Sequence, residues 1–181
     1  MPYKGSFQPK NPKKYLGDPN KITYRSGWER NVMKWLDETV SIEEWGSEEL
    51  AIPYEHPIRG GMAKYYPDFI VKFPDGVIKV IEVKPKKETS APEKPKRQTR
   101  QYLDRMATWV INQEKWTAAR KVCQANNLVF EIWTEEQLAE MGLLHMSPEN
   151  KKQTLRETAA RKKPKMKPVR RATRPRPTRK S

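Results

Sequence analysis

The feature that most constrains the fold is a β-hairpin pattern near the middle of the chain. Two apolar, β-branched runs, Tyr66–Val71 and Val80–Lys84, flank the turn sequence Pro74-Asp75-Gly76. Such runs on either side of a Pro-Asp-Gly turn are typical of antiparallel strands. We therefore predict strands at residues 66–73 and 77–84, joined by a tight turn.

The register of this hairpin brings two acidic residues together. If Phe73 pairs with Val77 across the turn, Asp68 lies directly opposite Glu82. Directly opposed residues have Cβ atoms about 4.5–5.5 Å apart, and like charges in that position destabilise a sheet unless something binds between them. Lys84 lies on the same face, two residues further along the strand. A hard divalent cation is the expected occupant of this position.

The rest of the chain predicts an α/β fold with elements in the order α-β-β-β-α-β-α. The first helix begins at Ser26, where Ser26-x-x-Glu29 is a capping-box pattern ahead of an apolar stripe at helical spacing. The other expected elements are a strand at residues 50–54, the hairpin, a helix from Gln98 that either continues through or restarts after Asn112-Gln113, a strand at 128–133, a short helix capped by Thr134 and ended by Gly142, and a helix starting at Ser147-Pro148.

Both faces of the predicted hairpin carry large apolar side chains, so its sheet needs cover on both sides. Helices on either face of a mixed sheet would provide that cover. Proline and charge are concentrated in Pro85–Lys96, directly after the second strand, which is typical of a mobile loop.

Composition divides the chain into three parts. Residues 1–24 are rich in Lys, Pro, Asn and Gly, and we expect an N-terminal arm that is irregular or ordered only by docking. Residues 25–146 hold the predicted sheet and its helices. Residues 147–181 are expected to form a short helix and a disordered basic tail, in which prolines recur among the cationic residues and prevent regular structure.

The net charge of +15 is concentrated in that tail. Residues 151–181 contain 14 Lys and Arg and a single acid, which leaves about +2 for residues 1–150. A segment of this kind favours sequence-independent binding to a polyanion, and we expect double-stranded DNA as the partner. The tail residues expected to bind it are Lys162, Lys163, Arg170, Arg171 and Arg174.

The sequence also limits where such a protein acts. One cysteine, Cys123, excludes an intrachain disulfide and suits a reducing compartment. No run of 18 apolar residues occurs, and the first residues lack the apolar core of a signal peptide. We expect a soluble intracellular protein with no membrane contact and no nucleotide cofactor.

The acidic hairpin resembles a known nuclease site. Pro67-Asp68 and Glu82-Val83-Lys84, with Glu29 on the preceding helix, form the P-D…E-x-K pattern of the PD-(D/E)xK, restriction-endonuclease-like nucleases. From about Tyr24 to Leu138 the chain is similar to the TnsA-like endonucleases and to the head completion nucleases of T4-like tailed phages. The segments that carry this similarity read YRSGWE, YYPDF, IEVK and KWTAARKVCQANNLVFEIWT.

The resemblance implies a restriction-endonuclease-like αβββαβ core and a Mg²⁺-dependent DNA endonuclease. It implies that Asp68, Glu82 and the backbone carbonyl of Val83 hold the Mg²⁺, for which Mn²⁺ is expected to substitute. Lys84 would orient the attacking water and offset the charge of the phosphate. Glu29 would hold a metal-bound water or a second metal.

The resemblance also implies a place in a phage. The expected activity is that of a head completion protein, which acts during DNA packaging and virion assembly in the host cytoplasm or in the virion. Portal or neck proteins of the phage head would then be its protein partners. The alternatives are a transposon-type end-cleaving endonuclease and a non-catalytic, structural DNA-binding head plug.

Each site residue has a structural explanation beside the functional one. Glu29 is the third helical residue of a capping box, and Glu82 and Lys84 would also fit an exposed polar stripe. Lys86 and Lys87 directly follow the strand and are expected to contact backbone phosphates on either side of the cut. A surface linker with incidental lysines is the other interpretation of that segment.

Overall fold

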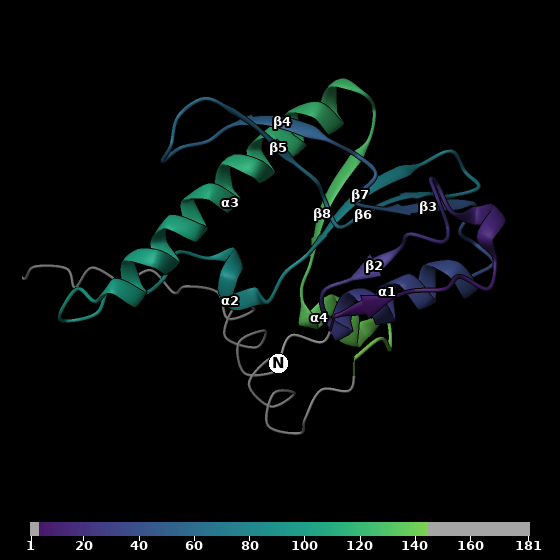
Figure 1. Ribbon diagram of the computed structural model, residues 1–181, viewed down its shortest axis with the longest axis horizontal. Helices are drawn as coiled ribbons and strands as arrows, with labels where there is room; N and C mark the ends of the chain where they lie inside the picture. Colours follow the sequence, from purple (N-terminus) through teal and green to yellow (C-terminus); the bar gives the residue numbers. More distant parts are fainter. Residues whose placement is uncertain (1–3, 145–181) are drawn as a thin grey trace, which may run out of the picture. The chain divides into compact units, whose positions relative to one another are not determined.

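A four-stranded mixed sheet forms the centre of the protein (Figure 1). The computed structural model describes residues 4–144. The elements are β1 (Gly5–Ser6), a short 3₁₀ helix (Pro12–Lys14), β2 (Thr23–Tyr24), α1 (Gly27–Glu38), β3 (Glu44–Ser47), β4 (Ile52–Glu55), β5 (Met62–Tyr65), β6 (Phe69–Lys72), β7 (Ile78–Val83), α2 (Lys86–Thr89), α3 (Arg100–Ala125), β8 (Val129–Trp133) and α4 (Glu135–Glu140). The strand order of the central sheet is β3-β6-β7-β8, and only the β7–β8 pair is parallel.

The predicted hairpin and its register are confirmed. Strands β6 and β7 are antiparallel with Phe69 opposite Ile81, and the Phe73 N–H donates to the Val77 carbonyl at 2.9 Å. The turn is closed by Asp75, whose carboxylate accepts from the Val77 N–H at 3.0 Å. This register places the residue before Phe69, which is Asp68, opposite Glu82.

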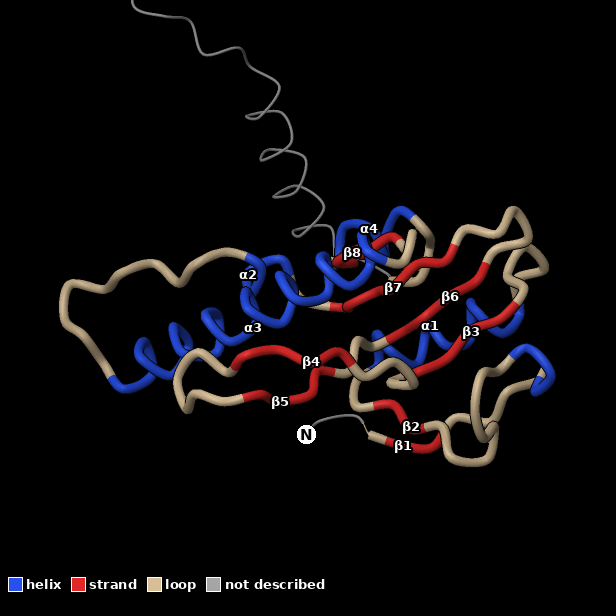
Figure 2. Tube along the Cα trace, turned by 90° about the horizontal axis from the view of Figure 1, so that it is seen from above, coloured by secondary structure: helices blue, strands red, loops and turns tan. Residues whose placement is uncertain are grey.

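Apolar clusters cover both faces of the central sheet. On one face, buried residues of α1 pack against alternate residues of β6 and β7; these are Val32, Met33, Leu36, Phe69, Val71 and Ile81. On the other face, Trp116 and Ala119 of α3 pack against the β4–β5 hairpin and against β8 (Figure 2). The expected mixed sheet flanked by helices is confirmed. Because side chains alternate along a strand, Glu82 and Lys84 lie on the α3 face.

The third antiparallel strand of the central sheet, β3, has no counterpart among the strands predicted from the sequence. The strand predicted at residues 50–54 is confirmed as β4, and it pairs only with β5 in a separate two-stranded sheet. Proline at position 53 cannot donate to a ladder, which suits such an edge. The central sheet instead uses β3, where Trp45 is fully buried opposite Val71. Four residues containing a glycine give no strand signal in the sequence.

The helices agree more closely with the sequence. Ser26 caps α1 by accepting from the Glu29 N–H at 3.1 Å, and Thr134 forms a complete capping box at α4. Helix α3 is continuous through residues 112–113, so the open alternative of a restart there is excluded. The loop predicted at residues 85–96 begins with one helical turn, α2. The helix expected at residue 147 and the basic tail lie outside the described residues.

The N-terminal arm is docked on the domain and contributes to its core. Tyr15 and Ile22 are buried in the same cluster as α1, and β1 pairs with β2. Asp37 of α1 is buried and its carboxylate accepts from the backbone N–H of Lys10 at 2.7 Å. The boundary drawn at residue 25 therefore does not separate the arm from the hydrophobic core. Within residues 4–144, no helix is both long and apolar enough to cross a membrane.

Candidate active site

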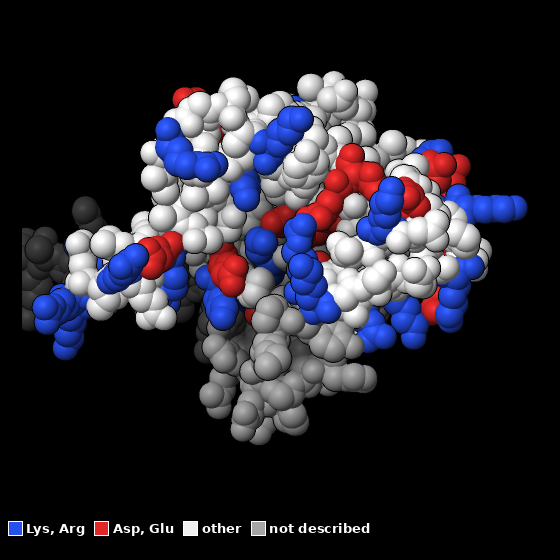
Figure 3. Space-filling view, in the orientation of Figure 1, with Lys and Arg blue, Asp and Glu red and all other residues white. Residues whose placement is uncertain are grey.

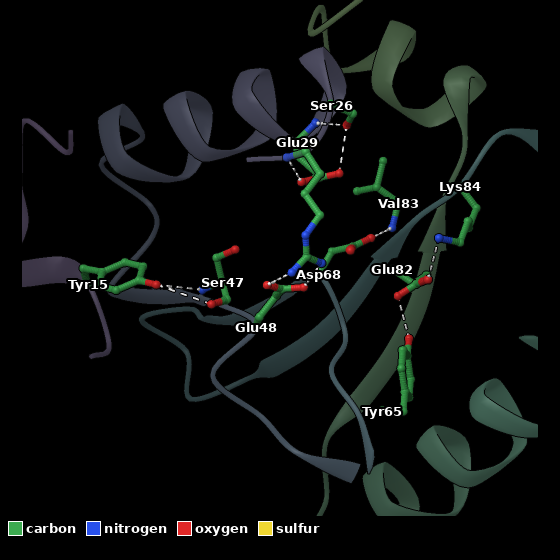
Figure 4. Close-up of polar contacts among 11 residues, drawn as sticks. Tyr15, Ser26, Glu29, Ser47, Glu48, Tyr65, Asp68, Glu82, Val83 and Lys84 are labelled. Carbon is green, nitrogen blue, oxygen red and sulfur yellow. Dashed lines mark hydrogen bonds and ion pairs between the residues drawn. The ribbon is translucent and has the colours of Figure 1, made fainter. Parts of the chain in front are cut away.

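Asp68 and Glu82 lie side by side at the open end of the β6–β7 hairpin (Figure 4). The Asp68 carboxylate accepts from the Val83 N–H at 2.7 Å, which fixes it across the end of the strand pair. Glu82 is buried, with 4% of its surface exposed. The sequence pattern therefore brings both carboxylates to the position that the register predicts.

Two further side chains hold the Glu82 carboxylate. The Lys84 ammonium forms an ion pair with one of its oxygens at 3.1 Å, and the Tyr65 hydroxyl donates to the other at 2.6 Å. Both partners are predominantly inside the protein, so these charge-assisted contacts are shielded from water. Glu82 is thus buried at the centre of a polar cluster in which Lys84 is partly exposed, and the exposed-stripe interpretation is wrong for Glu82.

Electrostatics at this cluster are dominated by burial and by the paired carboxylates. Burial, followed by the charge of Glu82, raises the pKa of Asp68 to about 8. Burial alone would lower the pKa of the Lys84 ammonium, but Glu82 and Asp68 outweigh it and raise this pKa. The site therefore carries more negative charge than its own side chains compensate when both carboxylates are ionised.

Glu29 lies near the pair but is held by the start of α1. Its carboxylate accepts from the Ser26 hydroxyl at 2.9 Å and from the Arg25 N–H at 2.7 Å. Its charge contributes to the raised pKa of Asp68, which places it within electrostatic range of the site. Only the Ser26 half of the predicted capping box is present, because the Glu29 carboxylate accepts from the Arg25 N–H and not from the Ser26 N–H. The catalytic function of Glu29 stays a prediction.

Tyr65 is the residue of this site that the sequence analysis missed. It ends β5, in the second hairpin, and points its hydroxyl at Glu82 (Figure 4). Burial and the charge of Glu82 raise the pKa of Tyr65, so its hydroxyl remains protonated as a donor at neutral pH. In the sequence, the position of Tyr65 three residues before Asp68 is only a weak indication that it belongs to the site. The direction of its ring depends on the pairing of β4 with β5.

The donor set of the site is composed of oxygen atoms. Asp68 and Glu82 supply two carboxylates, and the carbonyl of Val83 is next in the chain. Among residues 4–144, no group of three or more His, Cys, Asp and Glu side chains is placed to hold a metal. Two carboxylates fit Mg²⁺, which keeps several waters and needs only one or two of them, and they would not suffice for a metal that requires nitrogen or sulfur.

The lysines after the strand have different environments. The Lys86 ammonium donates to Glu136 of α4 at 2.6 Å, and the Lys86 N–H donates to Glu135 at 2.7 Å. Lys87 is exposed. The first lysine thus helps to fix α2 against α4. The tail residues 162, 163, 170, 171 and 174 lie outside the described part of the chain.

The fold and the site together define a class. A mixed β3-β6-β7-β8 sheet with helices on both faces, and a carboxylate pair at the open end of its central hairpin, make this a restriction-endonuclease-like α/β fold. The family profile "TnsA-like endonuclease N terminal" matches residues 39–135, a range that includes Asp68, Glu82 and Lys84 but not Glu29. The chain belongs to the TnsA-like endonuclease family.

A curated relative agrees with this assignment. The head completion nuclease of Enterobacteria phage T4 is 41% identical to the chain over 146 residues, which cover 78% of this chain and 97% of the relative. The predicted family is therefore confirmed, and with it a nuclease function.

Proposed function

We propose that this protein is a Mg²⁺-dependent endonuclease that hydrolyses phosphodiester bonds in double-stranded DNA. The observation that carries the proposal is the contact of Lys84 with Glu82 beside Asp68, because this cluster combines a cation for the substrate phosphate with two carboxylates for a metal. The pKa of Asp68 is raised to about 8, which means that the ionised carboxylate is unfavourable in this position. A bound cation would stabilise the ionised form, whereas a purely structural aspartate gains nothing from this environment.

The chain's own residues have separable functions in this proposal. Asp68, Glu82 and the Val83 carbonyl would hold the ion, and Mn²⁺ would substitute. When bound, Mg²⁺ supplies Lewis-acid stabilisation and a nucleophile at neutral pH. The Lys84 ammonium stays protonated, as its raised pKa requires, and orients the attacking water and offsets the charge on the phosphate. Glu29 would bind a further water at the edge of the site.

Acidic side chains gather in a band on the face of the protein drawn in Figure 3, with lysine and arginine side chains on both sides of it. DNA phosphates are repelled by such a band unless its charge is neutralised. A divalent cation bound by Asp68 and Glu82 would lower the negative charge that a DNA phosphate meets at the proposed site.

A plasmid-nicking assay tests the proposal directly. Supercoiled plasmid is incubated with the protein in Mg²⁺, in Mn²⁺ and in EDTA, and open-circle and linear products are measured. Nicking that requires the divalent ion is expected. Binding of DNA without cleavage under all three conditions would favour the structural head plug.

We further propose that the biological setting is phage head completion. The support is the T4 relative, which carries that name and is matched over 97% of its length. The protein would then act on packaged DNA in the host or the virion, with portal or neck proteins as partners. A transposon-type end-cleaving activity is the alternative within the same family.

Tyr65→Phe is expected to weaken metal binding while leaving the fold intact. Loss of the hydroxyl removes the donor that orients Glu82, and outer contacts of this kind are typically worth about 10–100-fold in metal affinity or activity. Half-maximal nicking should require a correspondingly higher Mg²⁺ concentration. Tyr66→Phe is the control, since that neighbouring ring is exposed. An unchanged Mg²⁺ dependence in Tyr65→Phe would show that the hydrogen bond does not position Glu82.

Deletion of residues 151–181 is expected to weaken binding to duplexes of any sequence by a similar factor. The segment carries 14 Lys and Arg against one acid, and loss of phosphate contacts should flatten the dependence of log K on log salt. Nicking at low salt and high enzyme should survive. The matched control replaces Lys162, Lys163, Arg170, Arg171 and Arg174 by Gln at constant length. An unfolded deletion variant would contradict the domain boundary.

A further inference from the structure

A second lysine reaches the site from α3. Lys115 is half-buried, and its ammonium lies 5.6 Å from the ring centroid of Tyr65 and 5.9 Å from that of Tyr54. Both distances are within the range of a cation–π contact. The Tyr65 hydroxyl donates to Glu82 at 2.6 Å, so the same tyrosine contacts both the Lys115 ammonium and the Glu82 carboxylate.

The Lys115 ammonium has no hydrogen bond or ion pair with any residue in the range 4–144. Other partly buried lysines do have carboxylate partners: Lys79 with Glu131 at 2.7 Å, and Lys86 with Glu136 at 2.6 Å. Among the described residues, Lys115 therefore differs from these lysines in contacting two aromatic rings and no carboxylate. The hydrogen-bond donors of its ammonium are left for another partner.

Electrostatics connect Lys115 to the site. Burial lowers its pKa, the charges of Glu82 and Asp68 oppose that effect, and the nearby Lys84 ammonium adds to it. The charges of Glu82, Asp68 and Lys84 thus all act on Lys115, which places its ammonium within electrostatic range of the site. An anion placed between the two lysines would satisfy both.

We propose that Lys115 is a substrate-contacting residue that donates to a non-bridging oxygen of the DNA phosphate at the cleavage position, on the α3 side, while Lys84 contacts the same phosphate group from the residue that follows β7. The inference rests on the proposed nuclease function and adds a residue to it. The ring faces of Tyr54 and Tyr65 contact the Lys115 ammonium and position it. They leave its N–H donors available for a phosphate oxygen. The shielding of this position from water strengthens the contact with the phosphate.

The competing interpretation is structural: Lys115 would only fasten α3 to the β4–β5 hairpin through its two aromatic contacts. The two interpretations differ in what Lys115→Met does. If the contacts of Lys115 stabilise the fold, its replacement by Met lowers the melting temperature. A substrate-contacting lysine that has no hydrogen bond or ion pair in the free protein can be replaced by Met with little change in the melting temperature, because the thioether also packs on the tyrosine rings.

The test compares Lys115→Met, Lys115→Arg and Lys121→Met, the last being an exposed lysine on the same helix. Each full-length variant is melted without DNA, and its single-turnover nicking rate is measured at saturating enzyme, so that affinity supplied by the tail does not affect the rate. Loss of one group that stabilises developing charge is typically worth about 10²–10³ in rate, and we expect at least about 10-fold for Lys115→Met. Lys115→Arg should retain most of the activity, because a guanidinium also binds phosphate, and Lys121→Met should match wild type.

Two results would overturn the inference: a wild-type nicking rate in Lys115→Met, or a lowered melting temperature that Lys115→Arg does not restore. Absence of nicking by the wild-type protein in both Mg²⁺ and Mn²⁺ would instead contradict the proposed function. In that case, the rise in melting temperature that a short DNA duplex causes tests the phosphate contact of Lys115 without any need for cleavage. A smaller shift in Lys115→Met than in Lys121→Met supports the phosphate contact, and equal shifts exclude it.

Discussion

Lys84→Ala is expected to reduce nicking about 10²–10³-fold at saturating DNA, which is the usual effect of removing one charge-stabilising group from a preorganised site. The Lys84 side chain is 27% exposed, and its ammonium lies 3.1 Å from the Glu82 carboxylate, beside the position that we propose for the phosphate. DNA affinity should change little, because the tail outside the site carries most of the positive charge. The measurement is the single-turnover rate in Mg²⁺ together with duplex binding by fluorescence anisotropy.

The control for Lys84→Ala is Lys79→Ala. Lys79 lies on the same strand, but its ammonium pairs with Glu131 at 2.7 Å on the opposite face of the sheet. Its loss removes a partly exposed ion pair worth about 0–1 kcal/mol and no site charge. Nicking at the wild-type rate by Lys84→Ala would remove this residue from the mechanism. An equal loss in both variants would indicate damage to strand β7 instead.

Asp68→Asn is expected to abolish metal-dependent nicking and to stabilise the metal-free protein at pH 8. The pKa of Asp68 is raised from 3.8 to about 8, so the folded protein retains a proton that the unfolded chain releases. The stability that this group contributes is therefore fully present below pH 4 and is lost as the pH rises to about 8. Asparagine has no such titration and still accepts a hydrogen bond from the Val83 N–H.

Thermal melting in EDTA across pH 5 to 8 measures this difference. The melting temperature of wild type should fall relative to that of Asp68→Asn over this range, by an amount on the order of 5 °C. Addition of Mg²⁺ should raise the wild-type value, more at pH 8 than at pH 6, because the ligands must be deprotonated. Asp75→Asn, at the other end of the same hairpin, should respond as wild type does. Equal Mg²⁺ shifts in all three proteins would place the cation elsewhere.

The hairpin shows what local sequence is sufficient to predict. Pro74, Asp75 and Gly76 define the turn, and the turn fixes the register of the two strands that it joins. The opposition of Asp68 and Glu82 follows from this register by counting. The caps of α1 and α4 were predictable for the same reason, since each depends on contacts within four residues.

The third strand and the N-terminal arm show where such prediction fails. Residues 50–54 have a better strand signal than Glu44–Ser47, but pairing decides which of them joins the central sheet. Strand β4 pairs with β5, the next strand in the chain, whereas β3 pairs with β6, which is more than 20 residues further on. Tyr15 and Ile22 lie in a segment whose composition indicates an irregular arm. Their burial depends on the surface that α1 and β3 offer.

The sequence by itself determined the hairpin register, the Ser26 and Thr134 caps and the opposition of Asp68 and Glu82, because these depend on local geometry. The order of the P-D…E-x-K motif along the chain determined the family resemblance. Only the tertiary structure brought Tyr65 to the Glu82 carboxylate and Lys115 to the aromatic rings beside it. Both come from elements that pack across the face of the sheet. A contact between side chains on separately folded elements depends on how those elements pack, and no periodicity along the chain records that arrangement.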